Sequence, residues 1–349
     1  MLANIIIKPS RIELHEIKTP TPSPGEIVVK IKAALTCGTD LKAFSRGHPM
    51  IPMPGVFGHE FSGIVTAVGK GVKIFKEGDE IMAVHSAPCL ECRYCKKRLY
   101  NLCEKLMNIK VLGAFAEYIL LPSHIVKQNV FYKPRNLTFE EAAFLEPLSC
   151  VVHGIKSLEI RKGDHVLVIG AGPIGLLHLL LLKNKGAIVS VTDINNKRLK
   201  MAKNLGADFI LKSNPPSSPF SKGGQGGILR KNKLSGFIGF DYVFECTGRP
   251  EVWKISVNYV RKGGTVILFG GCKLGTTVTY DTGRLHYDEI TLRGVFHFTP
   301  ADVKKAYKLL CGGKLGVSRL ISGSYPLSQI QKAFDKLSKG EGIKYAIIP

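Results

Sequence analysis

The stretch that decides the fold is GDHVLVIGAGPIGLLHLLLLKNKGAIVSVTDINNKRLKMAKNLGADFI, residues 163–210. It runs from a short apolar segment through a glycine turn into a longer apolar segment, which predicts strand, turn, helix, strand, helix and strand. The apolar runs 166–169 and 188–191 are continuous rather than alternating, which is typical of parallel strands covered on both faces. Residues 240–248 and 263–271 predict two more such strands. This part of the chain therefore predicts a doubly wound α/β domain.

The glycine turn of this stretch carries a GxGxxG pattern at residues 170–175. The pattern alone is weak evidence, but here it follows a strand, opens a helix and precedes Asp193 at the end of the next strand. This context favours a dinucleotide whose phosphates lie at the helix N-terminus. Asp193 can accept hydrogen bonds from both ribose hydroxyls and would repel a 2′-phosphate, which favours NAD over NADP. Arg198 weakens this preference, because an arginine close to the ribose could accommodate a phosphate. The candidate cofactor-binding residues are Gly170, Gly172, Pro173, Ile174, Gly175, Asp193, Arg198 and Thr247.

The two ends of the chain have a different character. Residues 25–34, 61–69 and 78–84 predict strands bounded by turns, which indicates a small barrel or sandwich. Residues 137–158 predict helix, and helices are also expected to open at Thr299-Pro300 and at Ser328, before a last strand at 343–348. At 349 residues the chain is too long for one ordinary core, so we expect two domains.

The segment 212–236, KSNPPSSPFSKGGQGGILRKNKLSG, does not fit a βαβ unit. Its prolines and glycines exclude a long crossover helix. We interpret it as a flexible, basic insertion that replaces most of a helix, with poor order over about 214–228.

Bulk composition excludes several classes of protein. The net charge of +22 is spread along the chain without a block of five or six like charges, which indicates a solvated surface or attraction for anionic ligands. The uncharged segment 166–182 is of marginal length for a membrane span and is broken by glycines. No signal-peptide pattern is visible, and nine cysteines, an odd number, argue against a disulfide framework. We therefore predict a cytoplasmic protein without a membrane partner.

Four cysteines gather in residues 87–106, at positions 89, 92, 95 and 103. Cys89, Cys92, Cys95 and Cys103 can close a tetrahedron around zinc, which leaves that metal no open position for a substrate. Such a lobe, together with the positive charge, also suggests a zinc-ribbon nucleic-acid binder. We disfavour that alternative, because between Cys92 and Cys103 the chain offers only four basic residues and two tyrosines (Arg93, Lys96, Lys97, Arg98, Tyr94 and Tyr100).

A second set of metal-binding side chains is dispersed: Cys37, His59, Glu60 and Glu146. A thiolate, an imidazole and a carboxylate suit zinc with an open fourth position, as in catalytic sites. Each of these residues alone would more often be a buried structural residue. Spacing alone does not bring the four together.

Five motifs occur in the order found in zinc-dependent medium-chain alcohol dehydrogenases, and the chain resembles their sorbitol (iditol) and threonine dehydrogenase branch. The motifs are CGTD (37–40), PGVFGHEFSGIVTAVG (54–69), the cysteine lobe, EPLSCVVHG (146–154) and VLVIGAGPIGLL (166–177). The resemblance implies a GroES-like, β-rich catalytic domain from residues 1–150 and 294–349, and a Rossmann NAD-binding domain from 151–293. It also implies a homo-oligomer, either a tetramer or a dimer.

The resemblance implies two zinc ions per chain, one of them structural in the cysteine lobe. Cys37, His59 and Glu60 would bind the catalytic zinc, and Glu146 would be a fourth ligand or hold the metal-bound water. Asp40 would orient the histidine ligand. A non-catalytic zinc-bound relative is disfavoured because none of these ligands is missing.

The implied reaction is hydride transfer from a zinc-bound alkoxide to NAD, which gives a ketone and NADH. Thr39 matches the hydroxyl that relays the proton. The family commonly has a histidine five residues after the cysteine ligand, where this chain has Lys42. Lys42 could relay the proton if its pKa falls, His48 could replace it, or the proton could pass directly to water.

The substrate implied by the branch is a secondary alcohol, polyol or cyclitol, similar to sorbitol or iditol. L-Threonine and polyol phosphates remain alternatives. Residues 284–300 would form part of the pocket. His286, Arg293 and His297 carry groups able to touch hydroxyls, although a solvated surface position is the interpretation that we favour for each.

Overall fold

The computed structural model describes residues 1–212 and 237–349. The expected insertion at 212–236 lies outside the described residues, apart from Lys212. The described residues form two compact units, Met1–His153 with His297–Pro349 and Gly154–Phe296. Each boundary lies three residues from the one expected from the sequence. The two units are described separately below.

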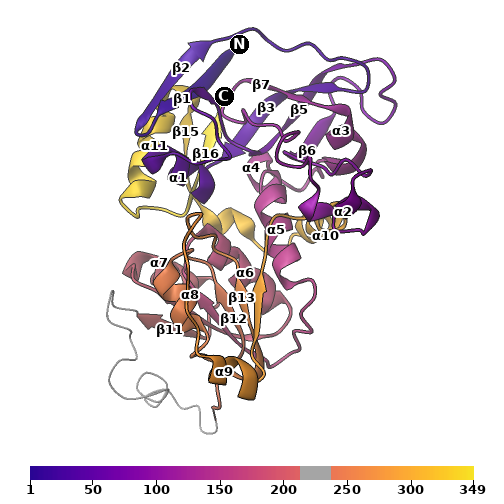
Figure 1. The fold of residues 1–349 in the computed structure, drawn as a ribbon. Helices are drawn as coiled ribbons and strands as arrows, with labels where there is room; N and C mark the ends of the chain where they lie inside the picture. Colours follow the sequence, from indigo (N-terminus) through magenta and orange to yellow (C-terminus); the bar gives the residue numbers. More distant parts are fainter. Residues whose placement is uncertain (213–236) are drawn as a thin grey trace. The chain divides into compact units, whose positions relative to one another are not determined.

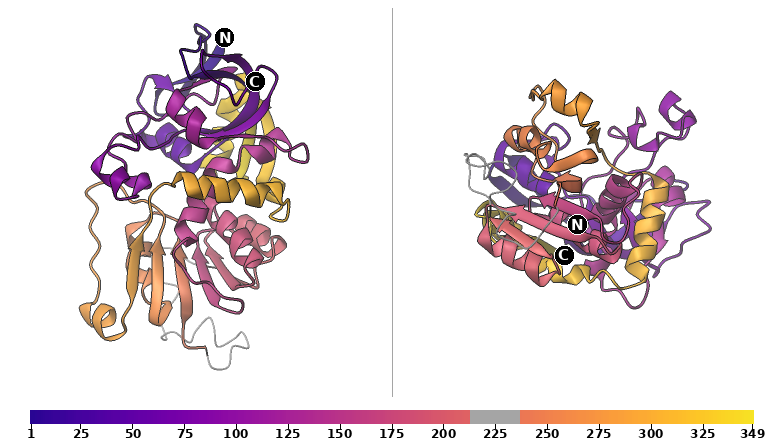
Figure 2. Two further views of the ribbon diagram at one scale, coloured as in Figure 1. Left: turned by 90° about the vertical axis from the view of Figure 1, so that its right-hand side faces the viewer. Right: turned by 90° about the horizontal axis from the view of Figure 1, so that it is seen from below.

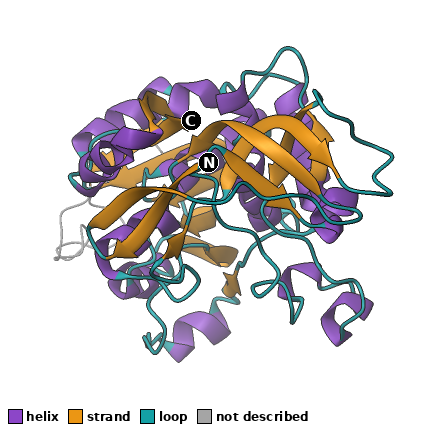
Figure 3. Cartoon of the chain, turned by 90° about the horizontal axis from the view of Figure 1, so that it is seen from above, coloured by secondary structure: helices purple, strands orange, loops and turns teal. Residues whose placement is uncertain are grey.

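The first unit contains a β-rich core with both chain termini in it (Figures 1 and 3). Its larger sheet has the strand order β15-β16-β3-β5-β6-β8 with β7 on β3, and its smaller sheet has the order β2-β1-β4. The strands are β1 (Leu2–Lys8), β2 (Arg11–Glu16), β3 (Ile27–Leu35), β4 (Gly55–Val56), β5 (Glu60–Val68), β6 (Glu80–Val84), β7 (Tyr118–Leu121), β8 (Val130–Tyr132), β15 (Ile321–Pro326) and β16 (Lys344–Ile348). The strands expected at 25–34, 61–69, 78–84 and 343–348 are confirmed.

The helices of this unit are short. They are α1 (Gly38–Arg46), α2 (Arg93–Lys96), α3 (Ser123–Asn129), α4 (Phe139–Ala142), α5 (Leu145–Ile155), α10 (Pro300–Cys311) and α11 (Ile330–Ser338). Three of them, α1, α4 and α10, begin after residues whose side chains cap them. Thr299 caps α10 as expected, in a capping box with Asp302. Ser328 does not cap α11: a 3₁₀ turn (Leu327–Gln329) precedes the helix, which begins at Ile330.

Aromatic packing explains why the two ends of the chain share one unit. Phe334 of α11 lies 5.8 Å from Phe57 and 6.0 Å from Phe115, measured between ring centroids. All three rings are fully buried. Since burial of such a ring contributes about 1.5–3 kcal/mol, this contact anchors the C-terminal segment on the N-terminal barrel. Strand β16 then pairs with β3, with Ala346 opposite Leu35.

The second unit is a six-stranded parallel sheet with the order β11-β10-β9-β12-β13-β14, whose pink and orange strands are visible in Figure 2. Numbered within the unit, this is the 3-2-1-4-5-6 order of a Rossmann domain, so the expected α/β class is confirmed. Its elements are β9 (His165–Ile169), α6 (Pro173–Asn184), β10 (Ile188–Asp193), α7 (Asn196–Asn204), β11 (Phe209–Lys212), β12 (Phe240–Glu245), α8 (Pro250–Ser256), β13 (Val260–Leu268), α9 (Thr282–Tyr287) and β14 (Thr291–Gly294).

The uncharged segment 166–182 divides into β9 and α6, as expected. Among the described helices, none has the length and apolar character needed to cross a membrane.

Candidate functional site

The dispersed site begins where β3 ends and α1 starts. Cys37 is the N-cap residue of α1, and its Sγ accepts a hydrogen bond of 3.4 Å from the backbone N–H of Thr39. Asp40, in the first turn of the helix, is completely buried. The helix cap therefore turns a thiol and a carboxylate toward the interior of the first unit.

A glycine places the next two residues. Gly58 has a φ of +87°, and a Cβ at this position would lie 2.7 Å from the ring of Phe115. No side chain other than hydrogen fits both the left-handed backbone and the neighbouring ring. The chain then enters β5, which buries His59 and Glu60.

Glu146 reaches the same region from the first turn of α5. Burial raises the pKa of Glu146 to about 7, and the charge of Glu60 adds to this, while His59 opposes it. A carboxyl group with such a pKa is typical of a functional site.

The structure brings these side chains together in two overlapping groups. Ligand atoms of Cys37, Asp40 and His59 lie within 4.8 Å of one another, and so do those of His59, Glu60 and Glu146. His59 Nδ1 lies 3.3 Å from Asp40 Oδ1. Burial would lower the pKa of His59, but the charges of Asp40 and Cys37 outweigh it and hold this pKa well above its usual value.

Lys344 on β16 is a member of the site that sequence reasoning missed. It is 1% exposed, it donates a 2.8 Å hydrogen bond to the carbonyl oxygen of Thr36, and it pairs with Oε2 of Glu60. Burial would lower the pKa of Lys344, but the negative charges of Glu60 and Cys37 raise it. The signal available in the sequence was one lysine in the otherwise apolar strand of residues 343–348.

These residues fit a divalent metal ion. Glu60 Oε1 is buried and has no hydrogen-bond partner among the described residues, although Oε2 is paired. An unsatisfied buried carboxylate oxygen is costly. A thiol, an imidazole and that oxygen are together a ligand set of the type that binds zinc.

Two further histidines border this cluster: His85, which sequence reasoning missed, and His297, which it gave as a residue able to touch hydroxyls but favoured at a solvated surface. His85 follows β6 and is 6% exposed, with its ring centroid 5.0 Å from that of His59. His297 lies 5.4 Å from His85, and its Nε2 is 2.7 Å from Ser86 Oγ. Burial, followed by the charge of His59, lowers the pKa of His297 to about 3. Since His297 is half-buried and contacts Ser86, the solvated surface position that we expected for it is wrong.

The other two candidates from residues 284–300 belong to the second unit. His286 is exposed on α9, and Arg293 is half-buried on β14. The structure does not group either residue with the dispersed site.

The candidate relay residues lie on or just after α1. Thr39 and Lys42 are half-buried on the helix, and His48 follows it. His48 Nδ1 accepts a 3.3 Å hydrogen bond from the backbone N–H of Met50. Burial, followed by the charge of Lys42, lowers the pKa of His48.

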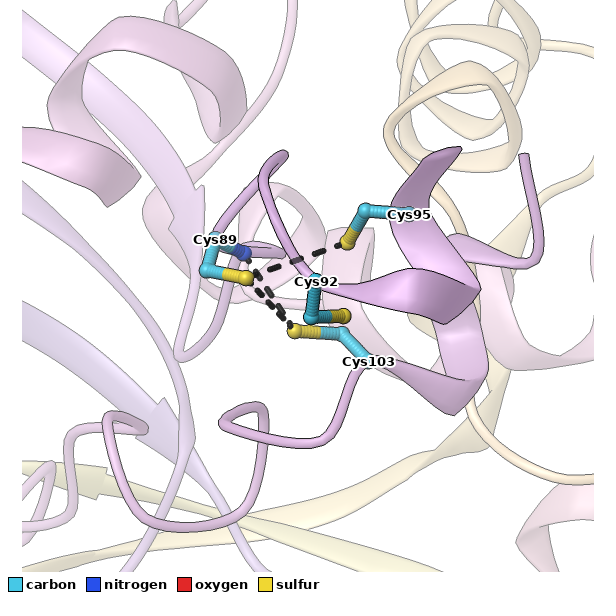
Figure 4. Close-up of side chains that lie close together, drawn as sticks. All are labelled: Cys89, Cys92, Cys95 and Cys103. Carbon is cyan, nitrogen blue, oxygen red and sulfur yellow. Dashed lines mark hydrogen bonds between the residues drawn. The ribbon is translucent and has the colours of Figure 1, made fainter. Parts of the chain in front are cut away.

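The four cysteines of the lobe face a common centre (Figure 4). Their sulfur atoms all lie within 4.8 Å of one another, with Cys103 Sγ 3.5 Å from Cys89 Sγ. The backbone N–H of Cys95 lowers the pKa of Cys92 to about 6. This arrangement fits a four-coordinate zinc with no open position.

In the second unit, the glycine turn has the geometry that the sequence predicted. Gly170 has a φ of +101°, Gly172 is the N-cap of α6, and Pro173 with Ile174 opens the helix. A Cβ on Gly175 would lie 1.8 Å from the carbonyl oxygen of Gly170, so only glycine fits. The turn therefore leaves the first N–H groups of the helix open toward a ligand.

Asp193 and Thr247 flank this turn. The Asp193 carboxylate accepts from the backbone N–H groups of Ala171 and Asn195, at 2.7 and 2.8 Å. Thr247 donates from its N–H to Glu245 Oε1 at 2.7 Å. Glu245 is fully buried. Sequence reasoning missed this residue, because the stretch ECTG that begins with it looks like the end of an ordinary strand. Arg198 lies on α7, and its Nε has no hydrogen-bond partner within the described ranges.

A Rossmann sheet in one unit and a buried thiol–imidazole–carboxylate cluster in the other define a metal-dependent dehydrogenase. Comparison with protein families agrees with this class. Residues 23–130 match the alcohol dehydrogenase GroES-like domain, and residues 173–311 match the zinc-binding dehydrogenase family.

Individual relatives cover nearly the whole chain. A sorbitol dehydrogenase from Halalkalibacterium halodurans is 32% identical over 95% of this chain and 94% of its own length. A D-arabitol-phosphate dehydrogenase from Enterococcus avium is 32% identical over 95% and 92%. The structure of an alcohol dehydrogenase from Thermus sp. ATN1 superposes with a TM-score of 0.86, at 28% identity, over 100% of this chain and 99% of that one.

The chain therefore belongs to the zinc-dependent medium-chain alcohol dehydrogenase family, in its sorbitol dehydrogenase branch. It is an oxidoreductase of the alcohol and polyol dehydrogenase type.

Proposed function

We propose that the protein interconverts a secondary hydroxyl group of a polyol and the corresponding ketone, with zinc and NAD(H). The observation that carries this proposal is the buried cluster of Cys37, His59, Glu60 and Glu146, in which one oxygen of Glu60 has no hydrogen-bond partner among the described residues. The sorbitol and D-arabitol-phosphate dehydrogenases among the relatives support a polyhydroxy substrate.

In this proposal Cys37, His59 and Glu60 hold the catalytic zinc, and Glu146 is a fourth ligand or holds the water on it. Zinc supplies a Lewis acid that lowers the pKa of a substrate hydroxyl. Asp40 lies 3.3 Å from Nδ1 of His59 and would fix the orientation of the ring. Lys344 occupies one oxygen of Glu60, which leaves the other for the metal.

The proton released from the substrate needs a route to solvent. We propose Thr39 as the first hydroxyl of this route, because its backbone is bound to Cys37 and the residue is partly exposed. Lys42 and His48 are candidates for the next step, since both lie near it on or after α1. Direct transfer to water is the alternative.

The cofactor proposed for the second unit is NAD. Both oxygens of Asp193 accept backbone hydrogen bonds, which fixes a negative charge next to the glycine turn. The Asp193 carboxylate would accept hydrogen bonds from the ribose hydroxyls and would repel a 2′-phosphate. Asp193→Ser replaces the carboxylate by a neutral hydroxyl. This change should lower kcat/KM for NAD about tenfold or more, since a hydrogen bond to a charged group contributes about 1.5–3 kcal/mol. Unchanged discrimination between NAD and NADP in this variant would contradict the assignment.

We further propose that the cysteine lobe holds a second, structural zinc ion, that the first unit is the catalytic domain and that the second is the NAD-binding domain. A homo-oligomer and a cytoplasmic location complete the proposal. The location is supported by nine cysteines without a disulfide, including the thiols of the lobe.

A polyol phosphate is the second candidate substrate, and one observation favours it. Half-buried Lys110 donates a 2.8 Å hydrogen bond to the carbonyl oxygen of Met107, and its charge is the smallest contribution to the lowered pKa values of His85 and His297. A cation beside the site would suit a phosphate. The D-arabitol-phosphate dehydrogenase among the relatives agrees with this alternative.

The decisive experiment combines metal analysis with a substrate panel. We expect about two zinc ions per chain and formation of NADH from sorbitol, xylitol or D-arabitol phosphate. Cys37→Ser should lose one zinc and the activity, whereas Cys103→Ser should lose the other zinc. Full zinc content in Cys37→Ser, with no NADH from any alcohol in the unmodified protein, would contradict the proposal.

A further inference from the structure

His85 lies beside the metal-binding cluster because of strand register. In the antiparallel pair β5–β6, Glu60 is opposite Val84. The preceding residue on one strand, His59, is therefore next to the following residue on the other, His85, and their ring centroids are 5.0 Å apart. His85 thus borders the proposed reaction site although it is not among the proposed metal ligands.

The Nδ1 atom of His85 is buried and has no hydrogen-bond partner in the described part of the chain. Oε1 of Glu146 lies 3.5 Å from this atom, which is longer than an N–H···O hydrogen bond. A buried polar atom without a partner is costly, and such atoms are usually satisfied by water or by a ligand.

The backbone on both sides of this ring is held in place. The carbonyl oxygen of His85 accepts a 2.8 Å hydrogen bond from the N–H of Val111. The carbonyl oxygen of Ser86 accepts one of 2.7 Å from the side chain of Asn129, which is fully buried. The backbone that carries the His85 side chain is therefore held in place, as expected for a residue that contacts a ligand.

His297 supports the same ring from another segment of the chain. The two rings are nearly perpendicular, at 88°, and Ser86 Oγ lies 2.7 Å from Nε2 of His297. His297 also has a φ of +61°, which is uncommon for a residue with a side chain. Local strain of this kind is concentrated at functional sites.

We propose that His85 is a substrate-binding residue, which hydrogen-bonds the hydroxyl on the carbon next to the one that is oxidised. This inference rests on the proposed function. A neutral imidazole offers one donor and one acceptor, which match a hydroxyl group. The residue would thus select vicinal diols and polyols over simple alcohols.

The test compares two substrates that differ by that hydroxyl, 2,3-butanediol and 2-butanol, in the zinc-loaded protein. His85→Phe keeps an aromatic ring but removes both nitrogens, and His85→Asn keeps a donor and an acceptor. We expect His85→Phe to lower kcat/KM for the diol at least about tenfold more than for the monoalcohol, with His85→Asn in between. His15→Asn, which removes an exposed histidine from β2, should change neither value.

A second measurement does not depend on turnover. Calorimetric binding of xylitol to the zinc-loaded protein with NADH should weaken about tenfold or more in His85→Phe, while the zinc content stays at the wild-type value. An equal loss of kcat/KM on both alcohols, or loss of zinc from both His85 variants, would overturn the inference and leave the proposed function intact. Failure of the unmodified protein to oxidise any alcohol would overturn the proposed function and the inference together.

Discussion

The cysteine lobe and the dispersed cluster are two candidate metal sites built in opposite ways. The lobe takes its four thiols from residues 89–103, within one loop. The dispersed cluster takes its side chains from the starts of α1, β5 and α5, and its buried cation from β16 near the end of the chain. Four thiols complete a tetrahedron, whereas the dispersed set mixes ligand types and includes a carboxylate oxygen without a partner in the described residues.

Their surroundings also differ. Around the lobe, the buried apolar neighbour is Leu106, with Tyr100 and Met107 partly buried against the cysteines. Both sites lie in the first unit, but the residues that flank His59 and Glu60 in the sequence, Phe57 and Phe61, belong to the large core of that unit. We therefore expect metal in the lobe to supply order, and metal in the dispersed cluster to supply chemistry.

The largest expected effect is on activity in Cys37→Ser. Loss of the proposed catalytic zinc should lower kcat/KM at least about 10³-fold, because a Lewis acid contributes several kcal/mol to the transition state. Zinc content should fall by one ion per chain while the thermal midpoint changes little. Steady-state kinetics and metal analysis measure both effects. If Cys37→Ser keeps the wild-type kcat/KM, the dispersed cluster does not supply the chemistry.

Cys103→Ser should have the complementary effect, on stability. If free zinc exceeds its dissociation constant a thousandfold, loss of the lobe metal removes about 4 kcal/mol of stabilisation. The activity that remains should depend on the fraction of folded protein. Calorimetric unfolding with and without a chelator measures the effect, and Cys272→Ser, a partly buried cysteine outside both sites, is the matched control. Equal stability of Cys103→Ser and this control would argue against a structural zinc.

Lys344→Met tests whether the dispersed cluster also needs a fixed cation. Removing one partner of a buried ion pair destabilises a protein by about 3 kcal/mol or more, because Glu60 keeps an uncompensated charge. Zinc should restore part of this loss, so the destabilisation should be larger in metal-free protein. Chemical denaturation in both states provides the measurement, with Lys344→Arg as the variant that retains the charge. An equal loss of stability in the zinc-loaded and the metal-free protein would show that Lys344 does not act on the metal site.

The smallest expected effect is that of Lys42→Ala on α1. If Lys42 relays the proton, kcat should fall and its pH dependence should shift, while zinc content and stability stay constant. Surface substitutions without a special role usually change stability by less than about 0.5 kcal/mol. A pH–rate profile identical to that of the unmodified protein would remove Lys42 from the relay and leave His48 or water.

Sequence reasoning predicted most of the second unit because its signals are local. Continuous apolar runs, a glycine turn and the acidic residue after the next strand all lie within about fifty residues of chain. In the first unit, the helix α11 starts at Ile330 instead of the expected Ser328, because a 3₁₀ turn precedes the helix.

The first unit was less accessible to such reasoning. Cys37, His59, Glu60 and Glu146 could be grouped only through the resemblance to a family, because no periodicity links residues so far apart. His85 and Lys344 were missed because their positions depend on strand register and on the pairing of β16 with β3. His297 was misjudged for the same reason, since its partner Ser86 is 211 residues away.

The sequence by itself determined the class of each unit, the thiol lobe and the nucleotide turn, because these depend on neighbours in the chain. Only the tertiary structure decided which charges are buried together and which polar atoms lack a partner. The pairing of Lys344 with Glu60 follows from the pairing of β16 with β3. The position of His85, whose Nδ1 has no hydrogen-bond partner among the described residues, follows from the register of β5 and β6. Electrostatic interactions become strong only where packing removes water, and no short stretch of sequence records that.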